Sequence, residues 1–350
     1  MPDMAILVEN GRIAEILTQH EWRASGRAAG GTPVAAPIVA PAFLDLQIYG
    51  AASRLLAVLP DAMTLFAMEQ ACRAGGTRYF LPTVATNPPE VFKKAIDAVR
   101  DYWDKGGTAI PGLHLEGPWI NPVKKGAHIE SFIHRPDLRE VQDLLDYGRG
   151  AISIITLAPE MCDRAVIDLI QEAGIKVSAG HSNATWDQAE QFFRYIHLAT
   201  HLFNAMSPLH HRAPGLPAAI MNGDPVRCSI VADGHHVDYP VIALAKKVMG
   251  PRLFLITDAV TETDTGPYRH HLVGDKYECN GILSGSALTM AKAVRNCRDY
   301  CGIPLDEALR MASRYPAEVL GREEITGTIH EGHRADLVLL NDRLEVLQTV

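Results

Sequence analysis

The feature that most constrains the fold of this chain is a regular alternation of short apolar runs with helix-like segments. Predicted helices include Ala62–Ala74, Pro89–Trp103, Asp163–Ala173 and Tyr239–Val248. The predicted strands are Pro41–Gln47, Thr77–Val84, Gly112–Glu116, Ile152–Ala158, Ile175–Gly180, Leu198–Asn204, Arg227–Ala232 and Leu253–Asp258. About eight β-α units over roughly 270 residues match a (β/α)8 TIM-like barrel better than an open doubly wound sheet.

Nearly every predicted strand ends on a polar or ionisable residue, and this also favours the barrel. These residues are Gln47, Thr83, Glu116, His181, His201, Asn204, Asp233 and Asp258. The carboxyl ends of the strands of a barrel share one rim, so residues that are far apart in sequence converge there.

Both ends of the chain carry strand signals without an apolar core of their own. Met4 to Ile16 is a predicted hairpin, because Asn10-Gly11 separates an apolar run from an alternating one. Residues 25–37 are rich in Ala, Gly and Pro and are a predicted connector. Residues 327–341 are again strand-like, with Gly332 at a turn. Strands from the two termini would protect their edges by pairing in one small β-module.

Composition narrows the function classes. The net charge of −8 argues against a nucleic-acid or membrane partner, because both select a basic face. The six cysteines form no Cys-x-x-Cys pair and indicate idle thiols in a reducing compartment. The chain shows neither an apolar stretch long enough to span a bilayer nor a signal-peptide pattern, so we expect a cytoplasmic protein.

Glu116, His181 and His201 are the predicted ligands of a metal ion. A carboxylate and two imidazoles are a ligand set for a metal that activates water. Each residue also has a structural alternative: a lone His is more often a hydrogen-bonded core residue, and a Glu before Gly-Pro can cap a turn. Their shared position on one rim favours the metal.

Asp258 closes the most apolar of the predicted strands, Leu-Phe-Leu-Ile-Thr-Asp. A buried Asp is unfavourable unless it is paired, and the sequence offers no obvious donor for it. We therefore expect a general base that takes a proton from the attacking water and later gives it to a leaving amine.

Other segments carry recognition chemistry. Arg212 has a planar fork suited to phosphate, and Asn204 could bind the same anion; an Arg212 that faces water is the alternative. After the seventh strand come Asp233, His235 and His236, and one histidine of that pair is either spare or serves a neighbouring subunit. The segment from Leu283 is predicted to open a helix whose amides bind polar oxygens, and a plain N-cap at Ser286 is the alternative.

Together these motifs resemble the N-acetylglucosamine-6-phosphate deacetylase family of the amidohydrolase superfamily. The matching segments are His114-Leu-Glu-Gly-Pro, Lys125-Gly-Ala-His128, Gly180-His-Ser, Thr200-His-Leu-Phe-Asn-Ala-Met, His211-Arg212, Ala232-Asp-Gly-His-His-Val, Thr257-Asp-Ala, Ser284-Gly-Ser-Ala-Leu-Thr-Met and Gly332-His-Arg-Ala-Asp-Leu-Val. They follow the family's order and span most of the chain.

The resemblance implies a metal-dependent hydrolase barrel over residues 39–317 and a small β-sandwich domain made of residues 1–38 and 318–350. The implied reaction converts N-acetyl-D-glucosamine 6-phosphate to D-glucosamine 6-phosphate and acetate, in amino-sugar catabolism. By position, Glu116, His181 and His201 match the metal ligands. Asp258 matches the catalytic acid/base, and His128 matches the group that polarises the amide carbonyl.

The resemblance also implies a substrate-binding set and a homodimer. The implied substrate-binding residues are Gln47, Ala127, His128, Asn204, Ala205, Arg212, Asp233, His236, Leu283, Ser284 and Gly285. In the implied homodimer, Arg212 and His236 reach the site of the neighbouring subunit.

One departure from the superfamily pattern bears on the metal. Many amidohydrolases carry His-x-His at the end of the first strand, where this chain has Gln47 and Tyr49. A neutral amide and a phenol are poor ligands, so we expect one divalent ion rather than two. Two imidazoles and a carboxylate favour Zn²⁺, with Fe²⁺, Co²⁺ or Mn²⁺ as alternatives.

Two other functions remain as alternatives. Another mononuclear amidohydrolase, acting on a related N-acyl sugar or a cyclic amide, is the nearest. A non-catalytic barrel is the alternative of a different class, and the presence of all three predicted ligands together with Asp258 argues against it.

Overall fold

The computed structural model describes residues 3–26, 33–323 and 326–350. Eight parallel strands form one sheet in the order β13-β12-β11-β10-β9-β8-β7-β4. They are β4 (Phe43–Ile48), β7 (Thr77–Ala85), β8 (Leu113–Glu116), β9 (Ile152–Leu157), β10 (Lys176–Ala179), β11 (Leu198–Ala199), β12 (Arg227–Val231) and β13 (Leu253–Ile256). The predicted barrel is confirmed.

The ring closes just beyond the end of β13. The backbone of Asp258 donates to Gln47 O at 3.0 Å, and Tyr49 donates to Ala259 O at 2.9 Å. A parallel bridge between Ile48 and Ala259 adds to this closure. The last strand thus meets the first at the rim that carries Gln47 and Asp258.

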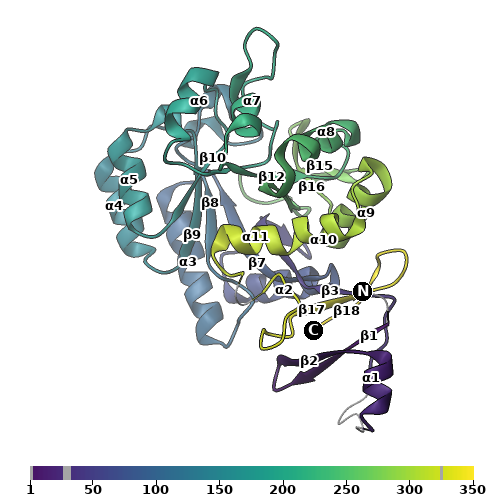
Figure 1. The fold of residues 1–350 in the computed structure, drawn as a ribbon. Coiled ribbons are helices and arrows are strands. Elements are labelled where there is room, and N and C mark those ends of the chain that lie inside the picture. The colour runs from purple at the N-terminus through teal and green to yellow at the C-terminus, as the bar shows by residue number, and fades with distance from the viewer. Residues whose placement is uncertain (1–2, 27–32, 324–325) are drawn as a thin grey trace.

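Helices surround the barrel (Figure 1). They are α2 (Ala62–Ala74), α3 (Pro89–Asp104), α4 (Leu138–Tyr147), α5 (Arg164–Glu172), α6 (Trp186–Phe192), α7 (Gly215–Asn222), α8 (Tyr239–Met249), α9 (Met290–Cys301), α10 (Leu305–Ala312) and α11 (Arg314–Leu320). Each of the longer helices buries one apolar stripe; in α3 this stripe contains Phe92, Ile96 and Val99. Among the described residues, none of the helices has the length and apolar content needed to cross a bilayer.

The interior of the barrel is partly polar. His114 bonds to Leu46 O at 2.9 Å through Nδ1 and to Thr156 Oγ1 at 2.7 Å through Nε2. Thr200 pairs with Thr156 at 2.7 Å and with Ser178 at 2.6 Å. These side chains satisfy one another, as buried polar groups must.

Strands from both termini form a separate small region beside the barrel (Figure 1). One sheet pairs β1 (Met4–Glu9) with β2 (Arg12–Thr18), and the other has the order β18-β17-β3, with β3 (Ile38–Pro41), β17 (Leu337–Leu340) and β18 (Val346–Thr349). Ile13, Ala335, Leu337 and Leu339 share one small core, so the predicted pairing of the termini is confirmed. The domain boundaries at residues 38 and 318 stay predictions.

The terminal segments differ from the sequence predictions in detail. Only Leu337–Leu340 of the strand-like segment 327–341 is a strand, although Gly332 does lie in a turn. The hairpin is followed by α1 (Gln19–Ala24), capped by Thr18, which was not predicted. Residues 27–32 of the predicted connector lie outside the described residues.

A three-stranded antiparallel sheet follows the last barrel strand and was also not predicted. It consists of β14 (His271–Val273), β15 (Lys276–Cys279) and β16 (Ile282–Ser286). The prediction that the segment from Leu283 opens a helix is therefore wrong. Helix α9 begins at Met290 with Thr289 as its N-cap, and Ser286 instead donates to Thr257 O at 2.6 Å.

The remaining elements are short. They are β5 (Gly50–Ala51), β6 (Arg54–Leu55) and the 3-10 turns Pro122–Lys124, Glu130–Phe132, Pro159–Met161 and Gly250–Arg252. The strand predicted at Leu198–Asn204 was too long, because β11 ends at Ala199. His201, Phe203 and Ala205 have φ of 39°, 76° and 48°, which no extended strand accommodates.

Candidate active site

The ends of β8, β10 and β11 deliver Glu116, His181 and His201 to one point on the rim. Glu116 Oε1 lies 3.1 Å from His201 Nε2 and 3.3 Å from His181 Nε2. The two imidazole Nε2 atoms are 3.1 Å apart. All three residues are buried. The predicted convergence of these side chains is therefore observed.

Three residues at this end of the barrel have unusual backbone conformations. His181, His201 and Asp258 have φ of 46°, 39° and 54°, in the left-handed region that non-glycine residues rarely adopt. Such strain persists only where surrounding contacts stabilise it, and it clusters at functional sites. Three residues of this site share the feature.

The donor set fits one small divalent cation. Zinc lies about 2.0–2.2 Å from nitrogen and carboxylate ligands, so tetrahedral ligands stand about 3.3–3.6 Å apart. The three observed separations, 3.1 to 3.3 Å, are close to the lower end of that range. Glu116, His128 and His181 also bring ligand atoms within 4.8 Å of one another, but His128 faces Oε2, the other oxygen of Glu116.

A backbone carbonyl orients one of the imidazoles. His181 Nδ1 lies 2.9 Å from Lys124 O and donates to it, which leaves the lone pair of Nε2 free for a cation. Burial, followed by the nearby His128, lowers the pKa of His181 to about 4. His181 is thus held in its neutral, ligating form. For His201 Nδ1, no hydrogen-bond partner is found among the described residues.

Glu116 is held by several groups at once. Burial alone would raise the pKa of Glu116, but His181, His128 and His201 outweigh it and hold that pKa well below its usual range. Tyr49 donates a short hydrogen bond to Oε2, and the Gln47 amide donates to Oε1 at 3.0 Å. Gln47 and Tyr49 thus orient the carboxylate by hydrogen bonding.

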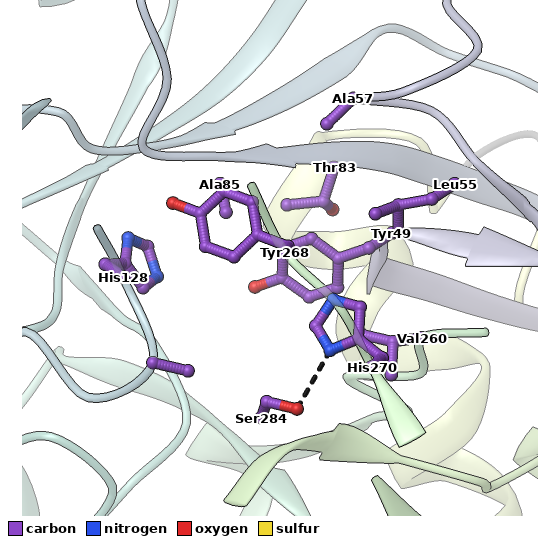
Figure 2. A pocket seen from close by; sticks show the side chains of 11 residues that line it. Tyr49, Leu55, Ala57, Thr83, Ala85, His128, Val260, Tyr268, His270 and Ser284 are labelled. Carbon is purple, nitrogen blue, oxygen red and sulfur yellow. Dashed lines mark hydrogen bonds between the residues drawn. The ribbon is translucent and has the colours of Figure 1, made fainter. Parts of the chain in front are cut away.

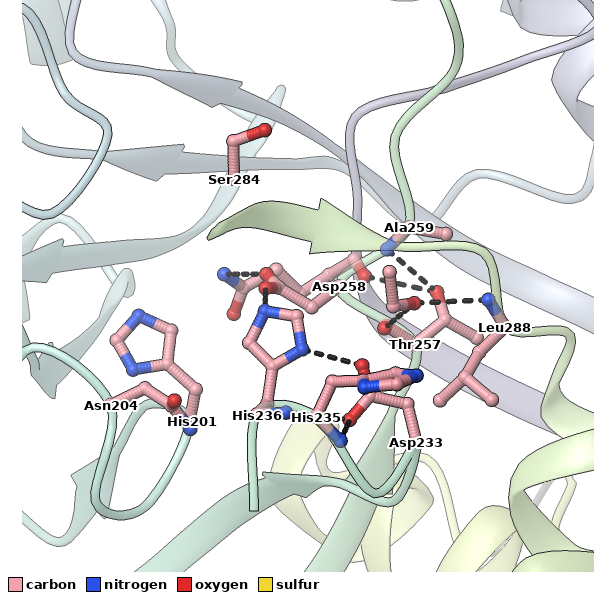
Figure 3. A network of polar contacts seen from close by, with 12 residues as sticks. His201, Asn204, Asp233, His235, His236, Thr257, Asp258, Ala259, Ser284 and Leu288 are labelled. Atoms are coloured by element: carbon pink, nitrogen blue, oxygen red, sulfur yellow. Dashed lines mark hydrogen bonds and ion pairs between the residues drawn. The ribbon is translucent and has the colours of Figure 1, made fainter. Parts of the chain in front are cut away.

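Asp258 lies beside this cluster with a different set of partners. The Gln47 amide donates to Oδ1 at 2.9 Å, and His236 Nε2 lies 3.5 Å from Oδ2. Asp233 accepts from His236 Nδ1 at 2.6 Å, so His236 stands between two carboxylates (Figure 3). Burial raises the pKa of Asp258, and the nearby His236 lowers it by less. A raised pKa suits a carboxylate that must accept a proton.

His128 borders a small cavity next to Glu116. Its Nδ1 lies 2.7 Å from Thr86 Oγ1, and its Nε2 lies 3.2 Å from Glu116 Oε2. The cavity has a volume of about 40 Å³. Tyr49, Tyr268 and His128 turn toward it (Figure 2), and Ala127 and Ser284 also line it.

Comparison with known proteins identifies the family. The profile of the amidohydrolase family matches residues 38–350. The chain belongs to the amidohydrolase family.

Individual relatives of this amidohydrolase are sugar-phosphate deacetylases. The N-acetylglucosamine-6-phosphate deacetylase of Haemophilus influenzae is 33% identical over 88% of this chain and 84% of its own length. The N-acetylgalactosamine-6-phosphate deacetylase of a Shewanella species is 34% identical over 98% of this chain and 89% of its own. The crystal structure of N-acetylglucosamine-6-phosphate deacetylase from Pasteurella multocida superposes with a TM-score of 0.93 at 33% identity, covering 100% of this chain and 94% of that one. The resemblance inferred from the motifs is confirmed.

The other residues predicted to bind substrate lie at several places around the site. Ala127, His128 and Ser284 line the cavity, whereas His236 contacts Asp258 and Asp233 holds His236 from the other side. Leu283 and Gly285 are the neighbours of Ser284 in β16. Asn204 and Ala205 lie in the turn after β11. Their roles in binding stay predictions.

Arg212 and His236 have different surroundings in this amidohydrolase. Arg212 is exposed in the loop before α7, and within the described ranges its guanidinium has no hydrogen-bond or ion-pair partner. His236 contacts Asp258 of its own chain, and His235 pairs outward with Asp275 at 2.5 Å. His236 thus contacts a residue of its own site, and the reach of either residue toward a neighbouring subunit stays a prediction.

Sequence reasoning missed two groups that support the site. Glu160 accepts from Ser182 Oγ at 2.7 Å and from Asn183 N at 2.8 Å, which anchors the residues directly after His181. Thr86 pairs with His128. Glu160 and Thr86 each follow a predicted strand, so the rule that picked out Glu116 could have included both.

Proposed function

We propose that this amidohydrolase hydrolyses the acetamide of N-acetyl-D-glucosamine 6-phosphate to D-glucosamine 6-phosphate and acetate. The observation that carries the proposal is the cluster of Glu116, His181 and His201 with Asp258 beside it. The proposal is supported by sequence similarity: over most of its length the chain is about one third identical to deacetylases named for this substrate. To form these two products the enzyme must cleave an unactivated amide. This cleavage needs an activated water and a proton for the leaving nitrogen.

Glu116, His181 and His201 would hold one divalent cation, with Zn²⁺ the best match to these donors. We choose His201 over His128 because His201 and His181 face the same oxygen of Glu116, whereas His128 faces the other. When bound, the cation supplies Lewis-acid activation of water and of the amide carbonyl.

Asp258 moves the proton in this scheme. Its carboxylate accepts a proton from the attacking water and gives it to the departing sugar nitrogen, which leaves as an amine. Gln47 orients Oδ1 through its hydrogen bond, and His236 faces Oδ2. His128 donates to the oxygen that becomes negative as water adds to the carbonyl. All of these groups already lie at the rim of the barrel, so the proposed reaction needs no rearrangement of the barrel.

The sugar phosphate requires a cationic partner outside this cluster. Arg212 is exposed and offers a guanidinium fork that matches phosphate geometry. We assign it to the 6-phosphate, with Asn204 nearby in the chain, in a homodimer in which Arg212 reaches the neighbouring subunit's site. The six free cysteines fit a reducing compartment such as the cytoplasm.

The 4-epimer is the second candidate substrate. The Shewanella relative, which matches 98% of this chain, is named for N-acetylgalactosamine 6-phosphate. The two sugars differ only in the configuration of one hydroxyl group, so the same cluster can act on either acetamide.

The test is a direct comparison of substrates. Purified protein loaded with zinc is assayed for acetate release from both N-acetylhexosamine 6-phosphates, from unphosphorylated N-acetylglucosamine and from a cyclic amide. We expect the highest kcat/KM with N-acetylglucosamine 6-phosphate. Preference for the galactosamine epimer would select the second candidate. Hydrolysis of the cyclic amide alone would overturn both.

A further inference from the structure

The cavity beside His128 has walls made mainly of carbon. Leu55 and Ala57 come from the segment after β5, Ala85 ends β7, and Val260 follows Asp258 after β13. The rings of Tyr49 and Tyr268 complete the wall (Figure 2). With residues 127–128 and Ser284 included, the cavity is built by five separate segments: 49–57, 83–85, 127–128, 260–270 and 284.

Most polar groups of this wall are already paired with protein. Tyr49 donates to Glu116, and Tyr268 donates to Thr86 O at 2.5 Å. His270 Nδ1 pairs with Ser284 Oγ at 2.8 Å, as the dashed line in Figure 2 shows. With these groups satisfied, the surface offered to a ligand is mainly apolar.

The cavity also adjoins the reacting atoms. His128, which donates to the amide carbonyl in the proposed reaction, lines it. Tyr49 lines it too, and its hydroxyl contacts the carboxylate of Glu116. His128 and Tyr49 therefore join the cavity to the Glu116 cluster.

We propose that this cavity binds the alkyl part of the acyl group that is removed, and that its walls set the longest acyl chain the enzyme accepts. The inference rests on the proposed function and deepens it. It adds Leu55, Ala57, Val260 and Tyr268 as residues that determine acyl specificity.

The volume sets the expected limit. The cavity of about 40 Å³ is small, so it accommodates only a short alkyl chain. An acetyl methyl occupies part of it. Propanoyl and butanoyl chains fit in the remaining space, and a hexanoyl chain exceeds it. Each additional buried methylene strengthens binding about fourfold until the wall is reached.

The experiment is a chain-length series. Zinc-loaded protein is assayed with the acetyl, propanoyl, butanoyl and hexanoyl amides of glucosamine 6-phosphate, and kcat/KM is plotted against length. We expect the propanoyl and butanoyl amides to remain within about twentyfold of acetyl. We expect hexanoyl to fall by about a hundredfold or more, since a misfit methylene is worth about 10- to 200-fold.

Three variants test the walls. Val260→Ala removes two methyl groups from the cavity, and we expect it to raise the relative kcat/KM of hexanoyl by about tenfold. Ala57→Val fills space in the cavity, and we expect it to lower kcat/KM for the butanoyl amide relative to the acetyl amide by a similar factor. Val273→Ala, an exposed change in β14, is the matched control and should leave the length profile unchanged. Thermal unfolding verifies that each variant is folded; if Val260→Ala is not, Ala57→Val alone decides.

The outcomes separate this inference from the function on which it rests. A length profile that is unchanged in Ala57→Val and in folded Val260→Ala, while the acetyl amide is still hydrolysed, overturns the acyl cavity and leaves the proposed function intact. Absence of hydrolysis of the acetyl amide by the wild type overturns the proposed function itself, and the inference with it.

Discussion

His236 Nε2 lies 3.5 Å from Asp258 Oδ2, on the side of the ring away from Asp233. Asp233 also accepts from the backbone N–H groups of His235 and His236, at 2.9 and 2.8 Å. This carboxylate therefore fixes both the position of His236 and the proton on its Nδ1. The hydrogen-bond partner of a functional imidazole thus sets the orientation and the tautomer on which the function of the imidazole depends.

Asp233→Asn should lower kcat by about 10- to 100-fold, because loss of the carboxylate frees His236 to rotate and change tautomer. Steady-state kinetics with metal content measured in parallel is the check, and metal content should not change. Asp275→Asn is the matched control, since Asp275 pairs with His235 on the surface. Equal kinetic effects of the two substitutions would refute a specific role for Asp233.

Asp258→Asn should reduce kcat by about a thousandfold, because an amide cannot accept the proton of the attacking water. The substitution keeps an oxygen that can accept from Gln47, so the cation ligands should stay in place. Metal analysis of the purified variant should give the wild-type stoichiometry. A variant with near-normal kcat would remove Asp258 from the mechanism.

Arg212→Ala should raise KM for the phosphorylated substrate by about 10- to 100-fold, the range expected for the loss of a charged hydrogen bond of about 1.5–3 kcal/mol. Activity on the unphosphorylated sugar should change little. Arg149→Ala is the control, because Arg149 is 83% exposed and pairs only with Asp146 among the described residues. Equal losses on both sugars would contradict a phosphate role for Arg212.

The barrel and its rim could be predicted because they depend on local signals. Short apolar runs mark buried parallel strands, and a polar residue at the end of each run marks the rim. Glu116, His181, His201 and Asp258 were found in this way. The sheet β14–β16 also had a local signal, since Gly274-Asp275 and Asn280-Gly281 are hairpin turn pairs.

Other features could not be predicted from local signals. Strand β11 has only two residues because His201 and Phe203 adopt left-handed backbone conformations. The strand-like pattern of Leu198–Phe203 gives no sign of these conformations. The bridging role of Gln47 depends on the closure of β4 against β13, over a separation of 211 residues. The cavity is bounded by five separate segments, so its size is a property of the assembled rim.

The buried His114 predicts how stability responds to acid. Burial lowers the pKa of His114 from 6.5 to about 4, while in the unfolded chain it titrates near the ordinary value. Above about pH 6.5 both states are neutral, so the stability contribution is constant there. Between about pH 6.5 and 4 only the unfolded chain takes up the proton, so stability falls as the pH falls. The loss should approach about 1.4 kcal/mol per pH unit for this one group.

Urea unfolding of metal-free protein between about pH 7.5 and 4 measures this loss without interference from cation release. His114→Gln should be less stable than the wild type at neutral pH, because Gln reproduces the bonds to Leu46 and Thr156 imperfectly, but its stability should decline less steeply toward acid. Equal slopes for wild type and His114→Gln would show that other groups, such as the buried His270 with its pKa also lowered to about 4, govern the acid response.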